Sequence, residues 1–234
     1  MVILMEEFQR LELLIGNKIN KLKETTVLII GLGGVGGAAT ESLIRSGVGK
    51  LILVDNDKID ITNLNRQIIS NQNNINLYKV DEWEKRAKSI NPNINIKKIK
   101  EFITEDNINI LFEEKIDYLI DACDTINTKK IIIKKCLEKN IKFISCMGTG
   151  NKFHPEYLEV TDIRKTSYDP IAKILRKMVN DEHIKGKIPV LYSKEKPLKI
   201  GKVGSNAFVP PVAGIMCANF IFNMIIEENN EKNS

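Results

Sequence analysis

Residues 31–67 decide the fold of this chain. They read GLGGVGG at Gly31–Gly37, LILVDNDKID at Leu51–Asp60 and ITNLNRQ at Ile61–Gln67. The glycines follow an apolar run at 27–30 and open a stretch with helical spacing, which is typical of a phosphate-binding loop between a strand and a helix. Such a loop lets phosphate approach the main chain and the free N–H groups of the helix N-terminus. The candidate nucleotide-binding glycines are Gly31, Gly33, Gly34 and Gly36.

The polar residues after the second apolar run indicate which chemistry the nucleotide undergoes. Asp55 lies 24 residues after Gly31, close to the spacing of an acid that binds a ribose hydroxyl. That feature alone would favour a dehydrogenase, which has no use for a cation and a second acid beside the phosphates. An enzyme that attacks an α-phosphate needs both. Arg66 would neutralise charge on phosphorus, Asp57 would help hold Mg²⁺, and Asn63 would orient a phosphate oxygen, with Gln67 beside them.

Taken together, the GxGGVG, DxD and NxNRQ motifs resemble those of the ThiF/MoeB-type adenylating enzymes, relatives of the ubiquitin-activating enzymes. The resemblance implies ATP and Mg²⁺ as ligands and adds three residues. Lys79, ahead of an INP motif at 90–92, matches a phosphate-binding lysine, and Asp124 matches a magnesium-binding aspartate that could also cap the next helix. Arg10 matches an arginine that reaches the nucleotide of a neighbouring subunit, which implies a homodimer.

Composition and cysteine spacing exclude several other classes of protein. The chain has 234 residues, of which 43% are apolar, enough for a sizeable core in one domain. Its net charge of +5 permits a nucleic-acid partner without requiring one. None of the four cysteines forms a CxxC pair, which argues against structural zinc and disulfides and fits a reducing cytoplasm. No signal peptide is evident, and the apolar run 212–226 is interpreted as too short for a membrane span.

Alternating strand and helix patterns predict a doubly wound, mostly parallel, Rossmann-like α/β sheet with helices on both faces. An amphipathic helix is expected at 5–22, with Phe8, Leu11, Leu14, Ile15 and Ile19 on its apolar face. The expected strands are 26–30, 50–54, 94–98, 117–121 and 141–146. Between them the pattern predicts helices at 34–46, 77–89, 105–111 and 126–139.

The whole chain is expected to form a single adenylating domain with three parts. Residues 1–150 would bind the nucleotide, and residues 151–209, rich in charge, would face the substrate and include a helix at about 169–180. A C-terminal extension at 210–228 would be a helix packed under the sheet, and residues 227–234 would fray.

A second resemblance covers this later part of the chain. Residues 160–170 read VTDIRKTSYDP and resemble the DIxKTxxDP stretch of the tRNA threonylcarbamoyladenosine dehydratases, as do the MGTGN loop at 147–151 and the YSxEKP stretch at 192–197. The resemblance implies that the substrate carboxylate attacks the α-phosphate of ATP, and that an atom of the ureido group then closes a ring on the acyl-adenylate. It also implies four contacts to tRNA phosphates, at Arg164, Lys165, Arg176 and Lys177.

Three other functions remain open at this point. The same chemistry could adenylate the C-terminal carboxylate of a ubiquitin-like sulfur-carrier protein, although the missing CxxC pairs and the basic segment 160–177 count against it. A catalytically silent nucleotide-binding adaptor is disfavoured by the intact Arg66, Lys79 and Asp124. A dehydrogenase is the least favoured. No cysteine matches the thioester cysteine of the ubiquitin-activating relatives.

Overall fold

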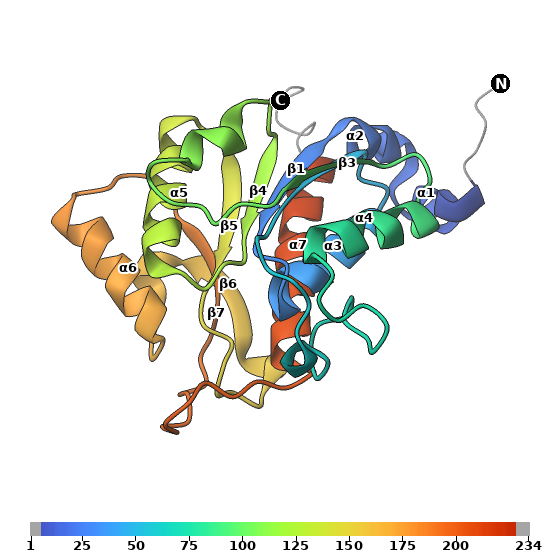
Figure 1. The fold of residues 1–234 in the computed structure, drawn as a ribbon. Coiled ribbons are helices and arrows are strands. Elements are labelled where there is room, and N and C mark those ends of the chain that lie inside the picture. Colours follow the sequence, from blue (N-terminus) through green and yellow to red (C-terminus); the bar gives the residue numbers. More distant parts are fainter. Residues whose placement is uncertain (1–5, 228–234) are drawn as a thin grey trace.

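A computed structural model describes residues 6–227 as one seven-stranded sheet with helices on both faces (Figure 1). The strand order is β3-β2-β1-β4-β5-β7-β6, and every neighbouring pair is parallel except β6 with β7. The predicted fold class is therefore confirmed. The strands are β1 (Thr26–Ile30), β2 (Lys50–Val54), β3 (Asn95–Ile99), β4 (Tyr118–Asp121), β5 (Lys142–Cys146), β6 (Leu158–Asp162) and β7 (Pro189–Ser193).

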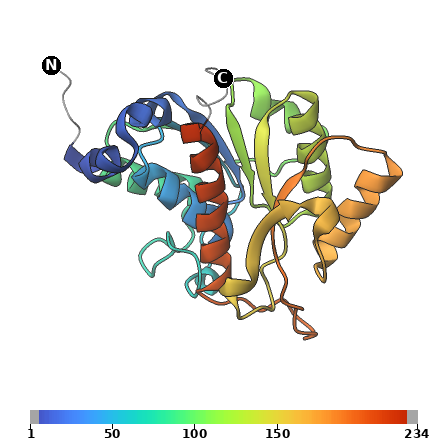
Figure 2. The same ribbon diagram turned by 180° about the vertical axis from the view of Figure 1, so that it is seen from behind.

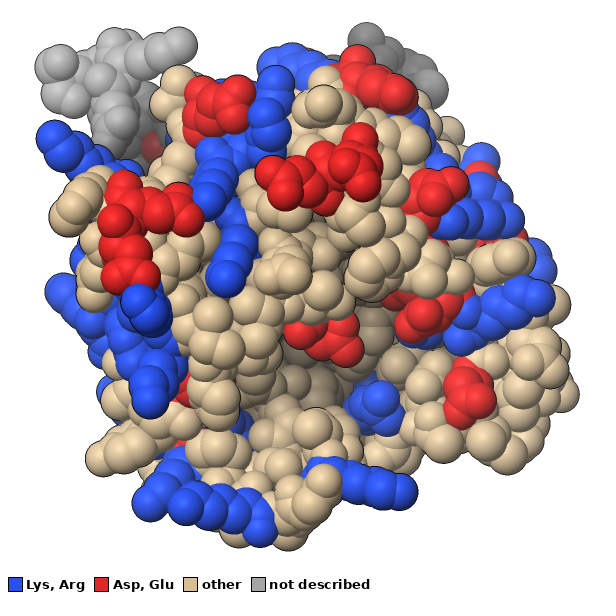
Figure 3. Space-filling view, turned by 60° about the vertical axis from the view of Figure 1, so that its left-hand side comes forward, with Lys and Arg blue, Asp and Glu red and all other residues tan. Residues whose placement is uncertain are grey.

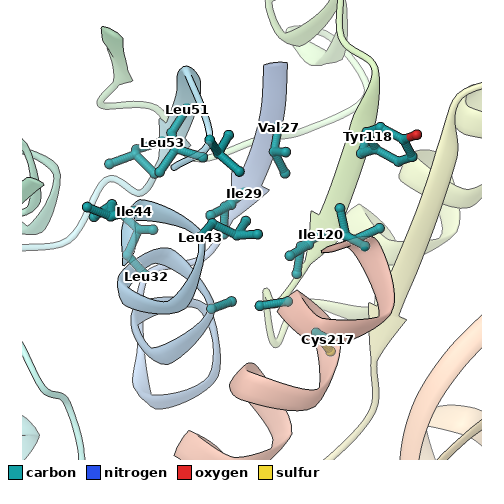
Figure 4. Close-up of a cluster of buried hydrophobic side chains, with 14 of the residues drawn as sticks. Val27, Ile29, Leu32, Leu43, Ile44, Leu51, Leu53, Tyr118, Ile120 and Cys217 are labelled. Carbon is teal, nitrogen blue, oxygen red and sulfur yellow. The ribbon is translucent and has the colours of Figure 1, made fainter. Parts of the chain in front are cut away.

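Two hydrophobic cores lie on opposite faces of the sheet, because successive side chains of a strand point to opposite sides. Val27 and Ile29 of β1 face one core, shown in Figure 4, while Leu28 and Ile30 face the other. The first core is covered by α3 (Gly34–Arg45), α4 (Lys79–Ile90) and α7 (Val209–Glu227), and the second by α5 (Ile126–Glu138) and α6 (Pro170–Asp181). Near-continuous apolar strands are expected when both faces are buried.

The N-terminal helix expected at 5–22 is broken, and this part of the prediction is wrong. The chain forms α1 (Gln9–Ile15) and α2 (Ile19–Glu24), separated by a 3₁₀ turn at Gly16–Lys18. Gly16 ends α1 with a φ of 62°, a conformation that glycine adopts without strain. Leu14 is 80% exposed on α1, although the helical pattern placed it on the apolar face with the buried Ile19. Residue 5 lies outside the described residues.

The C-terminal helix α7 packs closely on α3. A Cβ atom on Gly214 would lie 2.0 Å from the carbonyl oxygen of Val35, so only glycine permits this close approach between the two helices. With 19 residues and mean hydropathy 1.7, α7 is long and apolar enough to cross a membrane, which corrects the interpretation that the run is too short. Its contacts with α3 and the sheet instead place it in the core. Of residues 227–234, which were expected to fray, Glu227 is the last residue of α7, and 228–234 lie outside the described residues.

Segment 151–209 adds two strands to the sheet that the sequence patterns did not indicate. β7 pairs in parallel with β5, and β6 pairs antiparallel with β7 at the edge. At this edge Glu159 of β6 accepts a hydrogen bond from the Tyr192 hydroxyl of β7 at 2.8 Å. The predicted helix at 169–180 is α6, whereas the short helix expected at 105–111 is a 3₁₀ helix at Ile108–Phe112. The segment expected to face the substrate and the part expected to bind the nucleotide thus share one sheet.

Candidate functional site

A cavity of about 1110 Å³ opens at the carboxyl ends of β1, β2, β4 and β5. This edge is where open parallel sheets bind ligands, because the strand order reverses there. The volume is slightly above the roughly 300–1,000 Å³ of typical small-molecule pockets, so a nucleotide would leave room for part of a second substrate. Figure 3 shows a hollow in the surface with acidic side chains on its wall and basic side chains around it.

The glycine loop forms one wall of the cavity and leads directly into α3. Gly33 is the N-cap of α3 and no side chain caps the helix, so its first N–H groups are free to meet an anion. A Cβ atom on Gly36 would lie 1.7 Å from the carbonyl oxygen of Gly31, so this turn admits no side chain at position 36. Gly31, Gly33 and Gly34 line the cavity, whereas Gly36 shapes the loop from behind.

Asp55 directly follows β2, and its hydrogen bonds connect the glycine loop to the end of that strand. Its Oδ2 accepts a hydrogen bond from the Leu32 N–H at 2.6 Å, and its Oδ1 accepts one from the Asp57 N–H at 2.8 Å. Burial raises the pKa of the Asp55 carboxyl, and the charge of Lys79 partly offsets this. Each oxygen keeps a further lone pair toward the cavity, so the predicted ribose contact stays a prediction.

Lys79 provides a cation at the floor of the cavity. It is the first residue of α4, and its side chain is only 5% exposed. The Nζ atom lies 2.8 Å from Asp57 Oδ2 and 3.7 Å from Asp55 Oδ2. Asp57, by contrast, is 60% exposed. A buried lysine between two acids is held in place, and an incoming phosphate would meet a positioned charge.

The turn after β2 brings the other predicted phosphate ligands to the same cavity. Asn63 closes a capping box with Asp60 through its Oδ1, which leaves its amide N–H₂ for another partner. Arg66 donates to the Thr62 carbonyl at 2.8 Å and, in the described part of the chain, has no carboxylate partner. Gln67 is 6% exposed and its Oε1 has no hydrogen-bond partner among the described residues. Buried polar atoms are usually paired, and an amide oxygen accepts hydrogen bonds, so this oxygen suits a donor group of a ligand, such as a ribose hydroxyl, rather than a phosphate oxygen.

Asp124 lies across the cavity, in the turn between β4 and α5. It is exposed, and Thr125 rather than Asp124 is the N-cap of α5, so the expected capping role is wrong. Asp57 and Asp124 both line the cavity, and carboxylate oxygens suit Mg²⁺, which usually takes one or two of them together with substrate phosphates. Within residues 6–227 no cluster of three potential metal ligands occurs. The donor set therefore fits a metal that is completed by the nucleotide.

Besides Gly36, five predicted residues, all of them basic, lie outside the cavity. Arg10 is exposed on α1, and Lys165 and Lys177 are exposed near α6. Two arginines are engaged with their own chain. Arg164 donates to the carbonyl oxygens of Ile184 at 2.7 Å and Gly186 at 3.0 Å, and Arg176 donates to that of Thr166 at 2.8 Å.

Sequence reasoning missed a buried pair behind the second wall of the cavity. Loop residues 147–150 line this wall, and Lys152 donates from Nζ to the Gly148 carbonyl at 2.5 Å. The same Nζ lies 3.2 Å from Asp169 Oδ2, and both side chains are at most 1% exposed. The Asp169 carboxylate also caps α6. A lysine next to a glycine loop looks solvated in a sequence, so no local pattern could have revealed this pair.

Comparison with known proteins agrees with this geometry. The ThiF family model matches residues 7–233. The chain belongs to the ThiF family. This ThiF-family protein is 39% identical to a tRNA threonylcarbamoyladenosine dehydratase of Bacillus subtilis, with 96% of each chain covered. It superposes with a TM-score of 0.92 on the crystal structure of E. coli tRNA N6-threonylcarbamoyladenosine dehydratase in complex with ATP, at 28% identity and covering 97% and 96% of the two chains.

Another relative bears on the alternative function, adenylation of a sulfur-carrier protein. A molybdopterin-synthase adenylyltransferase of Haemophilus influenzae is 33% identical over 68% of this chain and 65% of its own length. The ThiF-family protein thus shares only part of its length with that enzyme. Its match to the dehydratases includes the segment after residue 150. Both resemblances inferred from the sequence motifs are confirmed.

Proposed function

We propose that this ThiF-family protein is an ATP-dependent tRNA threonylcarbamoyladenosine dehydratase. The observation that carries the proposal is the match over the full length of both chains, which includes the strands and loops that build the second wall of the cavity. A protein that shared only ATP binding and adenylation with the dehydratases would match them only over the part that includes the glycine loop and the first wall of the cavity. ATP is a substrate of this reaction rather than a resident cofactor.

The first step is attack by the substrate carboxylate on the α-phosphate of ATP. A P–O bond forms to the carboxylate, and the bond to pyrophosphate breaks. Free N–H groups at the start of α3 bind phosphate oxygens, and Lys79 and Arg66 stabilise the charge that grows on phosphorus and on the leaving group. Asn63 orients a phosphate oxygen through its amide N–H₂, Gln67 accepts a hydrogen bond from a donor group of the nucleotide, and Asp55 binds the ribose.

Asp57 and Asp124 would hold Mg²⁺ against the phosphates. A divalent cation there supplies neutralisation of phosphate charge and fixes the geometry of the leaving group. Asp57 would then exchange part of its contact with Lys79 for the metal, which frees the lysine to approach a phosphate.

The second step closes a ring within the substrate. An atom of the ureido group attacks the activated carbonyl and AMP leaves, so the nucleoside loses the elements of one water while ATP becomes AMP and pyrophosphate. An intramolecular attack depends mainly on positioning. Cys123 lines the cavity, but burial, reinforced by the nearby Asp121 carboxylate, raises the pKa of its thiol. A protonated thiol is a poor nucleophile, which fits direct ring closure without a thioester.

A homodimer would complete the site with Arg10 from the second subunit. Two apolar surfaces support this assembly. Leu13 and Leu14 are 84% and 80% exposed beside Arg10, and Ile215 of α7 is 49% exposed. Figure 2 shows that no other part of the chain lies in front of α7. Adjacent exposed apolar side chains such as Leu13 and Leu14 are candidates for burial against a second subunit. We place the protein in the cytoplasm, with its four free thiols.

The proposal is tested by measuring AMP and pyrophosphate release from ATP and Mg²⁺. One reaction contains tRNA that carries threonylcarbamoyladenosine, and a matched reaction contains the same tRNA without the modification. We expect release only with the modified tRNA. Release that ignores the tRNA but requires a small glycine-tailed carrier protein would support the sulfur-carrier function instead, and nucleotide binding with no release in either case would support the silent adaptor.

A further inference from the structure

We infer that Tyr168 is a stacking platform for an unpaired nucleotide that adjoins the modified nucleoside, at the rim of the cavity. The inference rests on the proposed dehydratase function and deepens it by locating part of the RNA-binding surface. Its occupant is a single-stranded segment of tRNA. Four features of the structure lead to this surface: the backbone of Tyr168, the anchoring of its turn, its position beside the cavity, and the charge around it.

The backbone of Tyr168 is in a conformation that a large side chain rarely adopts. Its φ is 56°, in the left-handed region. Three of the five non-glycine residues with positive φ in the described chain are asparagines, whose short side chains tolerate it. Tyr168 has no such advantage, yet its side chain is 66% exposed, so burial does not compensate for the strain. An exposed aromatic ring on a strained backbone points to a binding role.

Buried anchors on both sides hold this turn in place. Thr166 is 8% exposed and receives the Arg176 guanidinium on its carbonyl oxygen at 2.8 Å. Asp169 is 2% exposed and accepts a hydrogen bond from the Ala172 N–H at 2.9 Å. The two fixed residues present the Tyr168 ring on a rigid turn, which lowers the entropy lost when a base stacks on it.

The same anchors place Tyr168 next to the second wall of the cavity. Asp169 is bound to Lys152, which holds the carbonyl of Gly148, and Gly148 lines the cavity. Ile171, three residues after Tyr168, also lines it. A nucleoside whose carboxylate reaches the α-phosphate would therefore have its neighbours along the RNA close to this turn.

The charge of the surrounding segment suits RNA. Residues 163–204 contain eleven Lys and Arg residues but only four Asp and Glu residues, although the whole chain carries a net charge of only +5. Lys165 and Lys173 are exposed and have no ion pair within the described part of the chain. Arg164 and Arg176 donate to backbone carbonyl groups of their own chain, so the exposed lysines are left to meet phosphates. Aromatic stacking among backbone-binding cations is the usual way proteins grip unpaired nucleotides.

The test compares the steady-state kinetics of Tyr168 variants on tRNA that carries threonylcarbamoyladenosine. We expect Y168A and Y168G to raise the KM for this tRNA by roughly 5- to 100-fold, the scale of one lost base stack, with the KM for ATP unchanged. Y168F should behave like the wild type, because stacking does not need the hydroxyl. Y168G relieves the backbone strain and should fold at least as well as the wild type, so its loss of affinity cannot be attributed to unfolding.

His183→Gly is the matched control, since His183 is also exposed with a positive φ of 50°, but lies just beyond the far end of α6. This variant should leave the KM for tRNA unchanged. Lys165→Ala should reduce the slope of log KM against log salt by about one unit or slightly less, whereas Y168A should keep that slope. An active wild type with unchanged KM in Y168A and Y168G would overturn the inference alone, while a wild type inactive on the modified tRNA would overturn the proposed function.

Discussion

Replacing Lys79 by methionine tests the electrostatics of the site most sharply. The Lys79 side chain is 5% exposed, and its Nζ lies 2.8 Å from Asp57 and 3.7 Å from Asp55. The variant keeps a chain of similar length without the charge, so it leaves the 7%-exposed Asp55 carboxylate without its cation. Breaking a fully buried pair costs about 3–5 kcal/mol. Asp55 keeps two backbone hydrogen bonds and Asp57 is well solvated, so we expect about 1–3 kcal/mol at pH 8.

The pH dependence of this loss follows from the Asp55 carboxyl. Burial already raises its pKa above 3.8, and Lys79 partly offsets that rise. Removing Lys79 raises the pKa of Asp55 further, so folding penalises the charged form more strongly. The penalty is present above the folded pKa and is relieved as the pH falls through it, because the folded carboxyl then takes up a proton. The stability difference between wild type and K79M should therefore shrink as the pH falls from 8 toward 4, just above the ordinary pKa of 3.8.

The assay is urea unfolding without nucleotide at pH 8 and pH 4, followed by pyrophosphate release with the modified tRNA. K79M should also slow adenylation by roughly 10²- to 10³-fold. Lys98→Met is the matched control, because Lys98 pairs with Asp81 and Glu84 at 2.8 and 2.7 Å on the surface, 30% exposed. It should cost no more than about 1 kcal/mol and leave the rate unchanged. A loss of stability in K79M that is the same at pH 8 and pH 4 would refute the reasoning.

Three further predictions concern the loop, the metal and a buried acid. Gly36→Ala should abolish ATP binding measured by calorimetry, because its Cβ would meet the Gly31 carbonyl, whereas Gly201→Ala, with open space around it, should bind normally. Asp124→Asn should raise the Mg²⁺ concentration for half-maximal rate by about tenfold or more, and an unchanged Mg²⁺ titration would remove it from the metal site. Burial raises the pKa of Asp162, but the N–H groups of Ile188 and Arg164 and the Arg164 guanidinium outweigh this and lower it overall. The charged Asp162 carboxylate therefore stabilises the fold above pH 3.8, and this stabilisation is lost as the pH falls through the folded pKa. Asp162→Asn should destabilise the protein by about 1–2 kcal/mol at pH 7. The urea midpoints of the variant and the wild type should converge in strong acid.

The parts of the fold that depend on local pattern could be predicted from the sequence. β1 and β2 are uninterrupted apolar runs bounded by glycine or aspartate, and both were predicted with their observed bounds. β6 and β7 were not predicted, because strands of five residues with charged or proline ends look like loop until a neighbouring strand pairs with them. The exposure of Leu14 was also not predictable from local pattern. Leu14 has the spacing of an apolar helix face, but in the structure it lies exposed on α1, which ends at Gly16.

In the candidate site, too, the residues of short motifs could be predicted from the sequence, whereas long-range contacts could not. Gly33, Asp57, Arg66 and Lys79 were named from short motifs, and the structure brings them to one cavity because parallel strands end at the same edge. The motifs do not tell which basic side chains near α6 face solvent. Arg164 hydrogen-bonds to carbonyl groups about 20 residues away, a long-range contact without a local signal in the sequence. For the same reason the expected phosphate contacts at Arg164 and Arg176 remain predictions, and we expect Lys165 to be the stronger one.

The central claim is that the cavity dehydrates a carboxylate-bearing nucleoside in tRNA by way of an adenylate. The most direct measurement is the mass of that nucleoside, released from the tRNA after incubation with the protein, ATP and Mg²⁺. We predict that threonylcarbamoyladenosine loses the mass of one water in proportion to the AMP formed, and that the Lys79→Met variant produces neither. AMP formation with an unchanged nucleoside mass would contradict the account.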